Sequence, residues 1–508
     1  MSKAKAILIS PNPRTMSLVS PVVSHFYNIL KANDIEMKYF DTTLYDLSDK
    51  YVNAEKKIYE NFSAKEVREE HKVKIPGFGT TLKNREELLL DFRKEVEDYQ
   101  PDVILTSVME CTVRLMREML SHIHDLKVPH IVGGVFPTYA PDLAISYPEI
   151  DVLCVGEAEH IIAELVLKVK KGESLKGFPN TWYKDKDGNV IKNKMAPPND
   201  IDELPRFDVA PFHDSRFYRA MAGKIYRMFP VETHRGCTQK CTFCNSPVQD
   251  ELYLQETDQR YFRIRSIPKV MEDVKYFIEE CKADYLFFWA DHFFTYSRAQ
   301  IDEFCEAYKQ YKIPFYIQSY PSAIDDYKLT KLAEVGLNRI GMGIEHGNEK
   351  FRNEVIKRPY SNERAIKKME IVQEFNIQYS CNNIVGFPHE TPAIHWDTIE
   401  LNRALKADSA SCAIFTPFHG TPLRRMALEE GFLKDPNALA PSNFDYSILD
   451  MPQFPADLIE AKARVFNLYV MLPKSRWKDV EKAEKKTPEG NRIFEELREE
   501  IKEKEAEC

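Results

Sequence analysis

The sequence contains no uninterrupted run of about 18 apolar residues, the length that a membrane-spanning helix needs, so no membrane span is expected. It also lacks a dense block of lysine and arginine. With a formal net charge of −9, it shows no electrostatic footprint for nucleic acid, and we disfavour a nucleic-acid partner. The first residues, MSKAKAILISPNP, lack the pattern of a cleavable signal peptide. We therefore expect a cytoplasmic protein.

Cysteine is scarce as well, with 10 residues in a chain of 508. This density is too low for a disulfide framework. Three of the cysteines, Cys237, Cys241 and Cys244, nevertheless fall within eight positions. That local concentration favours metal or redox chemistry, and we expect the other cysteines to be plain thiols.

The first third of the chain alternates short apolar runs with amphipathic stretches. Strands are predicted at KAILIS, EMKYFD, DVILTSV, PHIVGGV and DVLCVGE, with helices such as VVSHFYNILKAND and TVRLMREMLSHIHD between them. This order is typical of a parallel sheet with crossover helices in an α/β protein. We predict a doubly wound, Rossmann-like domain over residues 1–170, with a polar insertion over 50–95 that we expect to be solvated helix.

A domain boundary is predicted in residues 171–225, where KDKDGNV signals a hairpin turn and the polar, proline-containing stretch after it indicates an extended linker. Six apolar runs then alternate with helical patterns over 226–420, which predicts a partial (β/α)6 barrel of the TIM type. The pattern over 421–508 predicts a helical C-terminal region. We expect its FPADLIEAKARVFNLYVMLP stretch to cap the barrel rather than to bind substrate.

The three cysteines follow the first predicted barrel strand with the spacing C-x3-C-x2-C. Barrel enzymes assemble their active sites at that end of the strands. Three thiolates can bind three irons of a four-iron cluster and leave the fourth iron open to another ligand. A closed zinc site would need a fourth protein ligand, and the nearest candidate, His234, precedes Arg235 in a predicted strand, where the two side chains alternate. The pattern therefore favours an open iron-sulfur cluster over zinc.

This motif, with Arg235 and Gly236 before the first cysteine and Phe243 before the last, resembles the radical S-adenosylmethionine (radical SAM) superfamily. The resemblance covers about residues 226–420. It implies a 4Fe-4S cluster whose open iron binds S-adenosylmethionine and generates a 5′-deoxyadenosyl radical away from oxygen. It also implies an electron donor such as flavodoxin or ferredoxin. The positions that resemble the superfamily's S-adenosylmethionine contacts are Phe243, Glu345 in GMGIEHG, and Asn383 and Gly386 in NNIVGFPHET.

Asp291 and His292, in WADHFFT, follow another predicted strand of the barrel. Because barrel active sites collect residues from several strand ends, both are candidate catalytic residues. The superfamily's glycine-rich segment after the second strand is not visible here, and the sequence assigns neither residue a step.

Small residues follow three strands of the predicted N-terminal domain. In a doubly wound sheet these loops lie where ligands bind, and small side chains leave room for a bulky ligand near the backbone. The segments are Thr106-Ser107-Val108-Met109, Gly133-Gly134 and Gly156-Glu157.

The arrangement resembles the cobalamin-binding domain that precedes the barrel in one large branch of the superfamily, which includes the class B methylases. The resemblance covers about residues 4–165. The D-x-H-x-x-G segment that supplies a histidine to cobalt in many cobalamin proteins is absent, because the first loop reads SPNPRTM, so no histidine ligand is expected. A domain that keeps this fold without its cofactor is the alternative. The resemblance implies cobalamin contacts from Asn12, Thr106, Ser107, Gly133, Gly134, Gly156 and Glu157.

With both cofactors, the resemblance implies a methyltransferase. The adenosyl radical removes a hydrogen atom from an unactivated carbon of a small-molecule or lipid-like substrate, methylcobalamin methylates that carbon, and a second S-adenosylmethionine restores the methyl group. The alternatives are a radical cyclase or rearranging enzyme without methyl transfer, and a non-catalytic cobalamin or iron-sulfur sensor. A methylthiotransferase acting on RNA is disfavoured, because its first domain would need a second cysteine set and this one has only Cys111 and Cys154.

Overall fold

The structure is a computed structural model that describes residues 3–12, 19–47, 83–221, 224–442 and 446–507. The chain forms two compact units. The first comprises Met1–Gly236 and Val248–Phe287, and the second comprises Cys237–Pro247 and Phe288–Cys508. Most of the predicted 50–95 insertion lies outside the described residues, and its C-terminal part belongs to an ordinary helix, α3 (Arg85–Tyr99).

The first unit contains a seven-stranded sheet in the order β2-β1-β3-β4-β5-β6-β7. Strands β1 to β5 run parallel to one another, whereas β6 and β7 are antiparallel to their neighbours. The order 2-1-3-4-5 is that of a doubly wound sheet whose topological switch point lies between β1 and β3. The predicted Rossmann-like fold is therefore confirmed. The strands are β1 (Ala4–Ile9), β2 (Ile35–Phe40), β3 (Val103–Ser107), β4 (His130–Gly133), β5 (Val152–Cys154), β6 (Thr181–Lys184) and β7 (Val190–Lys192).

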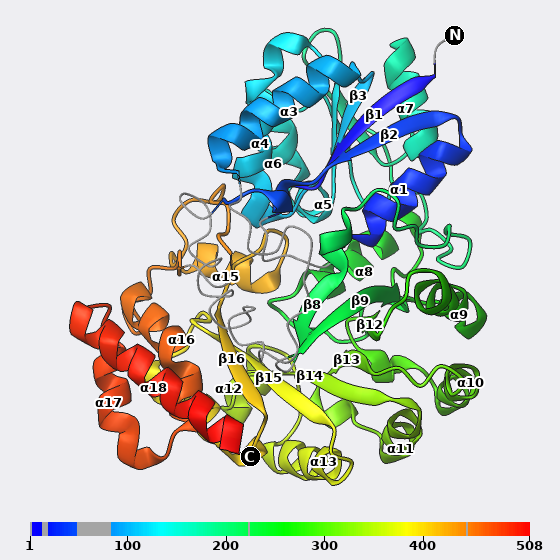
Figure 1. Ribbon diagram of the computed structural model, residues 1–508. Coiled ribbons are helices and arrows are strands. Elements are labelled where there is room, and N and C mark those ends of the chain that lie inside the picture. The colour runs from blue at the N-terminus through cyan, green and yellow to red at the C-terminus, as the bar shows by residue number, and fades with distance from the viewer. Residues whose placement is uncertain (1–2, 13–18, 48–82, 222–223, 443–445, 508) are drawn as a thin grey trace. The chain divides into compact units, whose positions relative to one another are not determined.

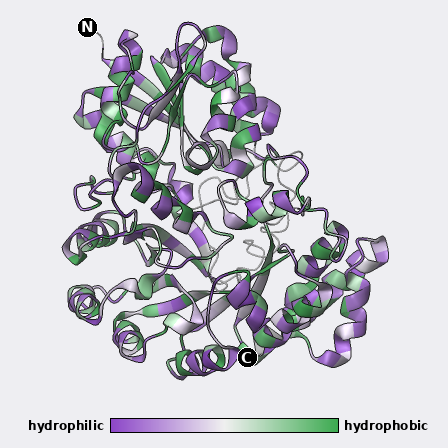
Figure 2. Ribbon diagram, turned by 180° about the vertical axis from the view of Figure 1, so that it is seen from behind, coloured by the Kyte–Doolittle hydropathy of each residue, from purple (hydrophilic) through white to green (hydrophobic). Residues whose placement is uncertain are grey.

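Helices cover both faces of this sheet, with α1 and α7 on one side and α3 and α4 on the other (Figure 1). Because both faces are covered, β1, β3 and β5 are buried almost throughout, which explains their continuous apolar runs. The strands are mostly green in Figure 2, whereas the helices carry both colours, as expected for one buried and one exposed face. Besides α3, the helices are α1 (Pro21–Ala32), α4 (Val113–His122), α5 (Val135–Tyr139), α6 (Pro141–Ser146) and α7 (Ile162–Lys171).

The predicted hairpin at KDKDGNV forms between β6 and β7. It is more than part of a linker, because β6 pairs with β5 and extends the first sheet. The remaining strands and helices of this unit bring the chain to the cysteines and away from them. They are β8 (Tyr218–Met221), β9 (Lys224–Glu232), β10 (His234–Arg235), β11 (Arg263–Ile264), α9 (Ile267–Lys275) with the π-helix η6 (Tyr276–Glu280), and α8 (Asn245–Thr257) from Val248 onward.

A second seven-stranded sheet has the order β16-β15-β14-β13-β12-β9-β8, and the boundary between the two units falls inside β12 (Tyr285–Trp289). Within the second unit, β13 to β16 are parallel, and α10, α11 and α13 lie along one face of the strands (Figure 1). The six predicted barrel strands are all present, and the predicted partial barrel is confirmed. The antiparallel strand β8 was not predicted. The strands of the second unit are β13 (Phe315–Ser319), β14 (Leu337–Glu345), β15 (Gln378–Val385) and β16 (Ser409–Ile414).

The region after residue 420 is helical, as predicted. Helix α16 packs against β16 and against the end of β15, which agrees with the expected capping role. None of the helices in the described residues is long and apolar enough to cross a membrane. The helices of the second unit are α10 (Arg298–Tyr308), α11 (Asp326–Val335), α12 (Glu349–Glu354), α13 (Asn362–Glu374), α14 (Pro392–Leu405), α15 (Pro422–Glu429), α16 (Ala456–Met471), α17 (Trp477–Ala483) and α18 (Pro488–Glu507).

Candidate active site

The cysteine loop, residues 237–244, is held in place by hydrogen bonds within the second unit. Thr242 donates its N–H to the carbonyl of Ile356 at 3.1 Å and its hydroxyl to the carbonyl of Val355 at 2.7 Å. The Nε2 of Gln239 donates to the hydroxyl of Tyr320, at 2.7 Å, just beyond the end of β13. The loop is therefore fixed against the segment after α12 and against the carboxyl end of a barrel strand.

The thiols receive backbone hydrogen bonds. The N–H groups of Gln239 and Ser246 point to the Sγ atoms of Cys237 and Cys244, each at 3.4 Å. Burial raises the pKa of Cys237 to about 11 and that of Cys244 to about 12, and it raises the pKa of Cys241 as well. The thiols alone therefore keep their protons at neutral pH, and a bound metal has to displace them.

The donor set fits an iron-sulfur cluster. Each thiolate of such a cluster binds a different iron, and N–H donors to the sulfurs are part of how proteins tune it. In the described part of the chain, no three His, Cys, Asp or Glu side chains converge closely enough to hold a single metal ion. A four-iron cluster does not require such convergence, because its ligands surround the cluster.

Glu345 ends β14 with a φ of 66°, at a register shift between β14 and β15. Few residues other than glycine adopt this conformation, which is concentrated at functional sites. Its carboxylate pairs with the guanidinium of Arg358, which also donates to the carbonyl of Gly343 at 3.1 Å. Burial raises the pKa of Glu345, and Arg358 opposes that effect. Arg358 likewise opposes the rise in the pKa of Cys241, whereas Glu345 adds to it, so both members of the ion pair act electrostatically on the cysteine loop.

The sequence indicated Glu345 but not Arg358. The arginine stands 13 residues after the glutamate, beyond α12, and no local pattern marks it. Only the fold brings the two side chains together.

The side chain of Asn383, a predicted S-adenosylmethionine contact, is committed to the protein. Its Nδ2 donates to the Oδ1 of Asn402 on α14 and to the carbonyl of Ser411, both at 3.0 Å, and it accepts a bond from Asn402 in return. Asn383 therefore lies on the helix-covered face of β15. Because side chains alternate along a strand, Asn382 lies on the opposite face, where it accepts a hydrogen bond from the hydroxyl of Ser411 at 3.1 Å. The choice between these neighbouring asparagines was not available from the sequence.

Gly386 and Phe243, two further predicted contacts, lie among apolar neighbours. Gly386 has a φ of 91°, and a Cβ at this position would lie 2.8 Å from the Cγ2 of Ile459 on α16. Only glycine therefore allows the end of β15 to meet that helix. Phe243 packs edge-on against Phe387, with the ring centroids 5.9 Å apart. The role of both residues toward S-adenosylmethionine stays a prediction.

Glu390 braces the loop after β15. Its Oε2 accepts the N–H groups of Gly386 and Phe387 at 2.6 and 3.0 Å, while its Oε1 lies 3.2 Å from the Nε2 of His346 and 3.3 Å from the Nδ1 of His395. The carboxylate is fully buried. Burial alone would raise the pKa of Glu390, but the interactions with the two histidines help to lower it to about 2. Since His346 follows Glu345 directly, this brace ties the loops after β14 and β15 together.

Asp291 and His292 lie near the cysteine loop. Asp291 accepts a hydrogen bond from the hydroxyl of Ser246 at 2.5 Å. The ring of His292 lies against Tyr320, with the centroids 4.6 Å apart, and Tyr320 is the partner of Gln239. Their catalytic role stays a prediction.

At the switch point of the first sheet, polar groups gather at the carboxyl ends of β1 and β3. Asn12 donates its N–H to the Oγ1 of Thr42 at 2.9 Å and its Nδ2 to the hydroxyl of Ser10 at 2.8 Å. The hydroxyl of Thr106, at the end of β3, is buried and has no hydrogen-bond partner within the described residues. An unpaired buried hydroxyl is costly, so a polar ligand at this edge would satisfy it. These residues fit a cofactor at the switch point.

The paired glycines after β4 allow a close approach of two loops. Gly134 has a φ of 104°, and a Cβ there would lie 2.7 Å from the backbone N and O of Val108 and 3.3 Å from the Oγ of Ser107. A Cβ on Gly133 would lie 3.3 Å from the Cβ of Cys154, a tight contact that a small shift would relieve. Gly134 is therefore needed for packing within the domain, whatever space the two glycines also leave for a ligand.

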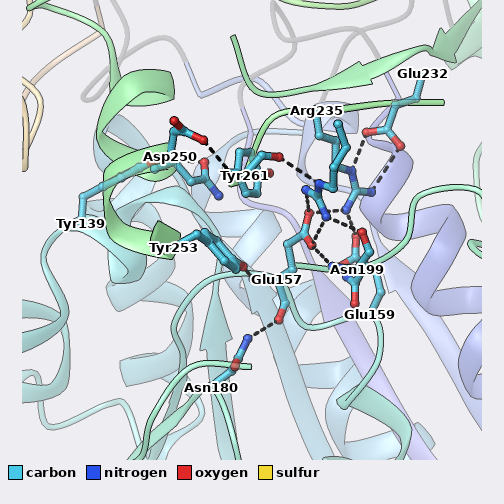
Figure 3. Close-up of polar contacts among 12 residues, drawn as sticks. Tyr139, Glu157, Glu159, Asn180, Asn199, Glu232, Arg235, Asp250, Tyr253 and Tyr261 are labelled. Atoms are coloured by element: carbon cyan, nitrogen blue, oxygen red, sulfur yellow. Dashed lines mark hydrogen bonds and ion pairs between the residues drawn. The ribbon is translucent and has the colours of Figure 1, made fainter. Parts of the chain in front are cut away.

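Gly156 and Glu157, after β5, make contacts with later parts of the first unit. A Cβ on Gly156, whose φ is 83°, would lie 2.6 Å from the hydroxyl of Tyr253. The carboxylate of Glu157 pairs with Arg235 and Arg263 (Figure 3). Their predicted role as cobalamin contacts is untested, and the contacts that the structure shows are with the protein itself.

The fold and the cysteine loop define the class: this is an α/β enzyme with a partial barrel built to hold an iron-sulfur cluster, joined to a doubly wound domain. Residues 231–401 match the Radical SAM superfamily, and residues 67–166 match the B12 binding domain. The chain is thus a radical SAM enzyme with a cobalamin-binding domain, and its cofactors are a 4Fe-4S cluster, S-adenosylmethionine and cobalamin.

Similar proteins include methyltransferases and a cyclase. An uncharacterized methyltransferase of Pyrococcus horikoshii is 25% identical over 82% of this chain and 88% of its own length. The anaerobic magnesium-protoporphyrin IX monomethyl ester cyclase of Rubrivivax gelatinosus is 22% identical over 64% of this chain and 58% of its own. A solved structure with the same fold is that of the cobalamin-dependent S-adenosylmethionine radical enzyme OxsB, with aqua-cobalamin and S-adenosylmethionine bound. Its TM-score is 0.66 at 16% identity, and the match covers 98% of this chain and 71% of that one.

Proposed function

We propose that this protein is a methyltransferase that transfers a methyl group to an unactivated carbon of a small-molecule or lipid-like substrate. The observation that carries the proposal is the presence of a radical SAM domain and a B12 binding domain in one chain, which is similar over most of its length to a protein named a methyltransferase. When bound, the cofactors supply a hydrogen-abstracting radical and a methyl donor.

In this proposal Cys237, Cys241 and Cys244 are the three protein ligands of the 4Fe-4S cluster. Glu345 accepts a hydrogen bond from S-adenosylmethionine, and Arg358 opposes the rise in the pKa of that carboxylate that burial causes. Phe243 and Gly386 shape the same site, and Asn383 supports it from the helix-covered face of β15 through its hydrogen bonds to Asn402 and Ser411. The contribution of these residues to the rate is placement, because a substrate carbon held beside the reacting groups replaces a rare encounter.

Cobalamin contacts are proposed at the switch point of the first sheet, from Asn12, Thr106 and Ser107, with Gly133, Gly134 and the Gly156-Glu157 loop shaping the same edge. No histidine of the first loop is proposed as a cobalt ligand, because its sequence is SPNPRTM. The domain limits proposed with this function are 1–170, 171–225, 226–420 and 421–508.

Radical SAM enzymes take an electron from a reductant, and we propose flavodoxin or ferredoxin as the donor. We also propose a cytoplasmic location. Nine of the ten cysteines lie within the described residues, and none of these nine forms a disulfide there, a state that reducing compartments maintain. Asp291 and His292 are proposed as substrate-facing catalytic residues.

The proposal is tested on anaerobically purified protein from cells grown with cobalamin. About four irons and one cobalt per chain are expected. With reductant and candidate substrates, the product should gain the mass of one methylene group, and S-adenosylhomocysteine should form. Similarity to the Rubrivivax cyclase favours the second candidate, a radical cyclase. Formation of 5′-deoxyadenosine without S-adenosylhomocysteine, or protein without cobalt, would support the cyclase instead.

A further inference from the structure

A cluster of five charged side chains is buried inside the first unit (Figure 3). It comprises two arginines and three glutamates, each with a side chain 5 to 16% exposed: Arg235, Arg263, Glu157, Glu159 and Glu232. Burying charges is costly unless they are paired and hydrogen-bonded. Even a paired cluster of this kind adds little net stability, and its value lies in fixing one arrangement of the chain.

The two arginines are opposite partners in the β10–β11 pair. Like charges at directly opposed positions destabilise a strand pair. Glu157 lies between them: its Oε1 is 2.8 Å from the Nη1 of Arg235 and 2.7 Å from the Nη2 of Arg263. Its Oε2 is 2.9 Å from the Nη1 of Arg263. The carboxylate is thus the shared counterion that lets these strands pair, and together the two arginines lower the pKa of Glu157 to about 2, although burial alone would raise it.

The other carboxylates complete the network around Arg235. Glu159 contacts its Nη1 at 2.7 Å, and Glu232 contacts its Nε at 2.9 Å. Asn199 donates its N–H to Glu157 at 2.7 Å and its Nδ2 to Glu159 at 2.9 Å. A buried network in which the members are satisfied in this way is rigid and specifies one arrangement.

The loop after β5 also holds helix α8. The hydroxyl of Tyr253 accepts the N–H of Glu157 at 2.7 Å and fills the space that a Cβ on Gly156 would occupy. One turn earlier on the helix, Gln249 accepts a hydrogen bond from the hydroxyl of Tyr139 at 2.8 Å. Tyr139 belongs to α5, which follows the paired glycines after β4.

These contacts involve the two chain segments that flank the cysteines. Arg235 stands two residues before Cys237, and α8 begins directly after Cys244. Both flanks of the cysteine loop are therefore attached to one loop of the doubly wound domain. We propose that Glu157, acting through Arg235 and Tyr253, is a positioning residue that sets the conformation of the cysteine loop from the carboxyl end of β5.

The proposal rests on the proposed function only in treating the three cysteines as cluster ligands. It gives the GEAE segment, residues 156–159, a task that cofactor contact does not explain: it holds the two chain segments that flank the cysteine loop, β10 and α8.

The test compares Glu157→Gln with a matched control, Asp273→Asn. Asp273 is also a buried carboxylate, and it pairs with Arg265, two residues after Arg263, but it belongs to α9 and not to the loop after β5. A third variant, Glu157→Gln with Arg263→Gln, removes one arginine charge together with the counterion. The first measurement is hydrogen–deuterium exchange of peptides covering 233–247 in protein without the cluster.

We expect exchange in 233–247 to be at least about tenfold faster in Glu157→Gln than in the wild type, nearly unchanged in Asp273→Asn, and partly restored in the double variant. After reconstitution, Glu157→Gln should bind iron, but its reduced cluster should show an altered electron paramagnetic resonance spectrum with S-adenosylmethionine and form about tenfold less 5′-deoxyadenosine.

Wild-type exchange and an unaltered spectrum in Glu157→Gln would overturn the proposal, as would equal changes in Asp273→Asn. If Glu157→Gln does not fold, the double variant decides: it should then fold with faster exchange confined to 233–247, and failure of that pattern contradicts the proposal. If the wild type itself takes up no iron, the proposed function fails, whereas the exchange measurement still decides this inference.

Discussion

Replacing Glu390 with glutamine tests how the loops after β14 and β15 are held. The wild-type carboxylate accepts two backbone N–H groups on one oxygen and faces two histidines with the other. A glutamine amide has only one acceptor oxygen, so its NH2 group must face either the two backbone donors or the histidine pair. At least one buried donor loses its partner, and the negative charge that the histidines share is gone.

The magnitude follows from the pKa of Glu390, which falls from an ordinary 4.5 to about 2 in the folded protein. Such a shift corresponds to about 3 kcal/mol of stability. Because the folded pKa is lowered, this contribution is fully present above pH 4.5 and is lost as the pH falls toward 2. We expect Glu390→Gln to lower the free energy of unfolding by about 3 kcal/mol at pH 7, with a smaller difference below pH 4.5.

The assay is urea unfolding followed by tryptophan fluorescence, since three of the four tryptophans, Trp289, Trp396 and Trp477, belong to the second unit. The control is Glu430→Gln, whose carboxylate pairs with His389 at the surface and should matter by less than about 1 kcal/mol. Equal stabilities of the Glu390 variant and the wild type at pH 7, or a difference that grows as the pH falls below 4.5, would refute the reasoning.

Two further substitutions probe the two cofactor regions. Gly134→Ala should destabilise the first unit by about 2 to 5 kcal/mol in urea unfolding, because its Cβ would meet the backbone of Val108 at 2.7 Å. The control Gly172→Ala, also at positive φ but in open space, should cost only about 1 to 2 kcal/mol. Similar costs for the two variants would contradict the packing argument. Arg358→Met leaves the effect of burial unopposed, so the pKa of Glu345 should rise further. The affinity for S-adenosylmethionine, measured by equilibrium binding, should fall about tenfold, and more at pH 6 than at pH 8. Unchanged affinity at both pH values would argue against the role of the ion pair.

The parallel strands of the first sheet were predictable because strands covered on both faces are apolar almost throughout, and the runs from KAILIS to DVLCVGE have that character. In the second sheet β13, β15 and β16 instead alternate buried and less buried residues, which is the other pattern that indicates a strand. The cysteines were predictable for a different reason. Their spacing is local, so the sequence alone brings the thiols to one loop. The end of β14 at Glu345 was also visible, because the strand and the acidic residue are adjacent.

Other parts of the site depend on contacts between distant residues. Glu157 and Arg235 are 78 positions apart, so nothing in the sequence around Gly156 shows that the glutamate is a counterion. The sequence predicted Asn383 as a contact, but choosing between Asn383 and Asn382 requires knowing which face of β15 the helices cover. The sequence predicted Gly386 as a contact for S-adenosylmethionine. The structure adds its close packing against Ile459 of α16. Spacing cannot indicate such contacts.

The most direct test of the central claim is the formation of 5′-deoxyadenosine by reduced, reconstituted protein supplied with S-adenosylmethionine, measured beside Cys241→Ala. The account predicts 5′-deoxyadenosine from the wild type and none above background from the variant, because the variant lacks one of the three cluster ligands. No 5′-deoxyadenosine from iron-loaded wild type, or equal amounts from both proteins, would contradict it.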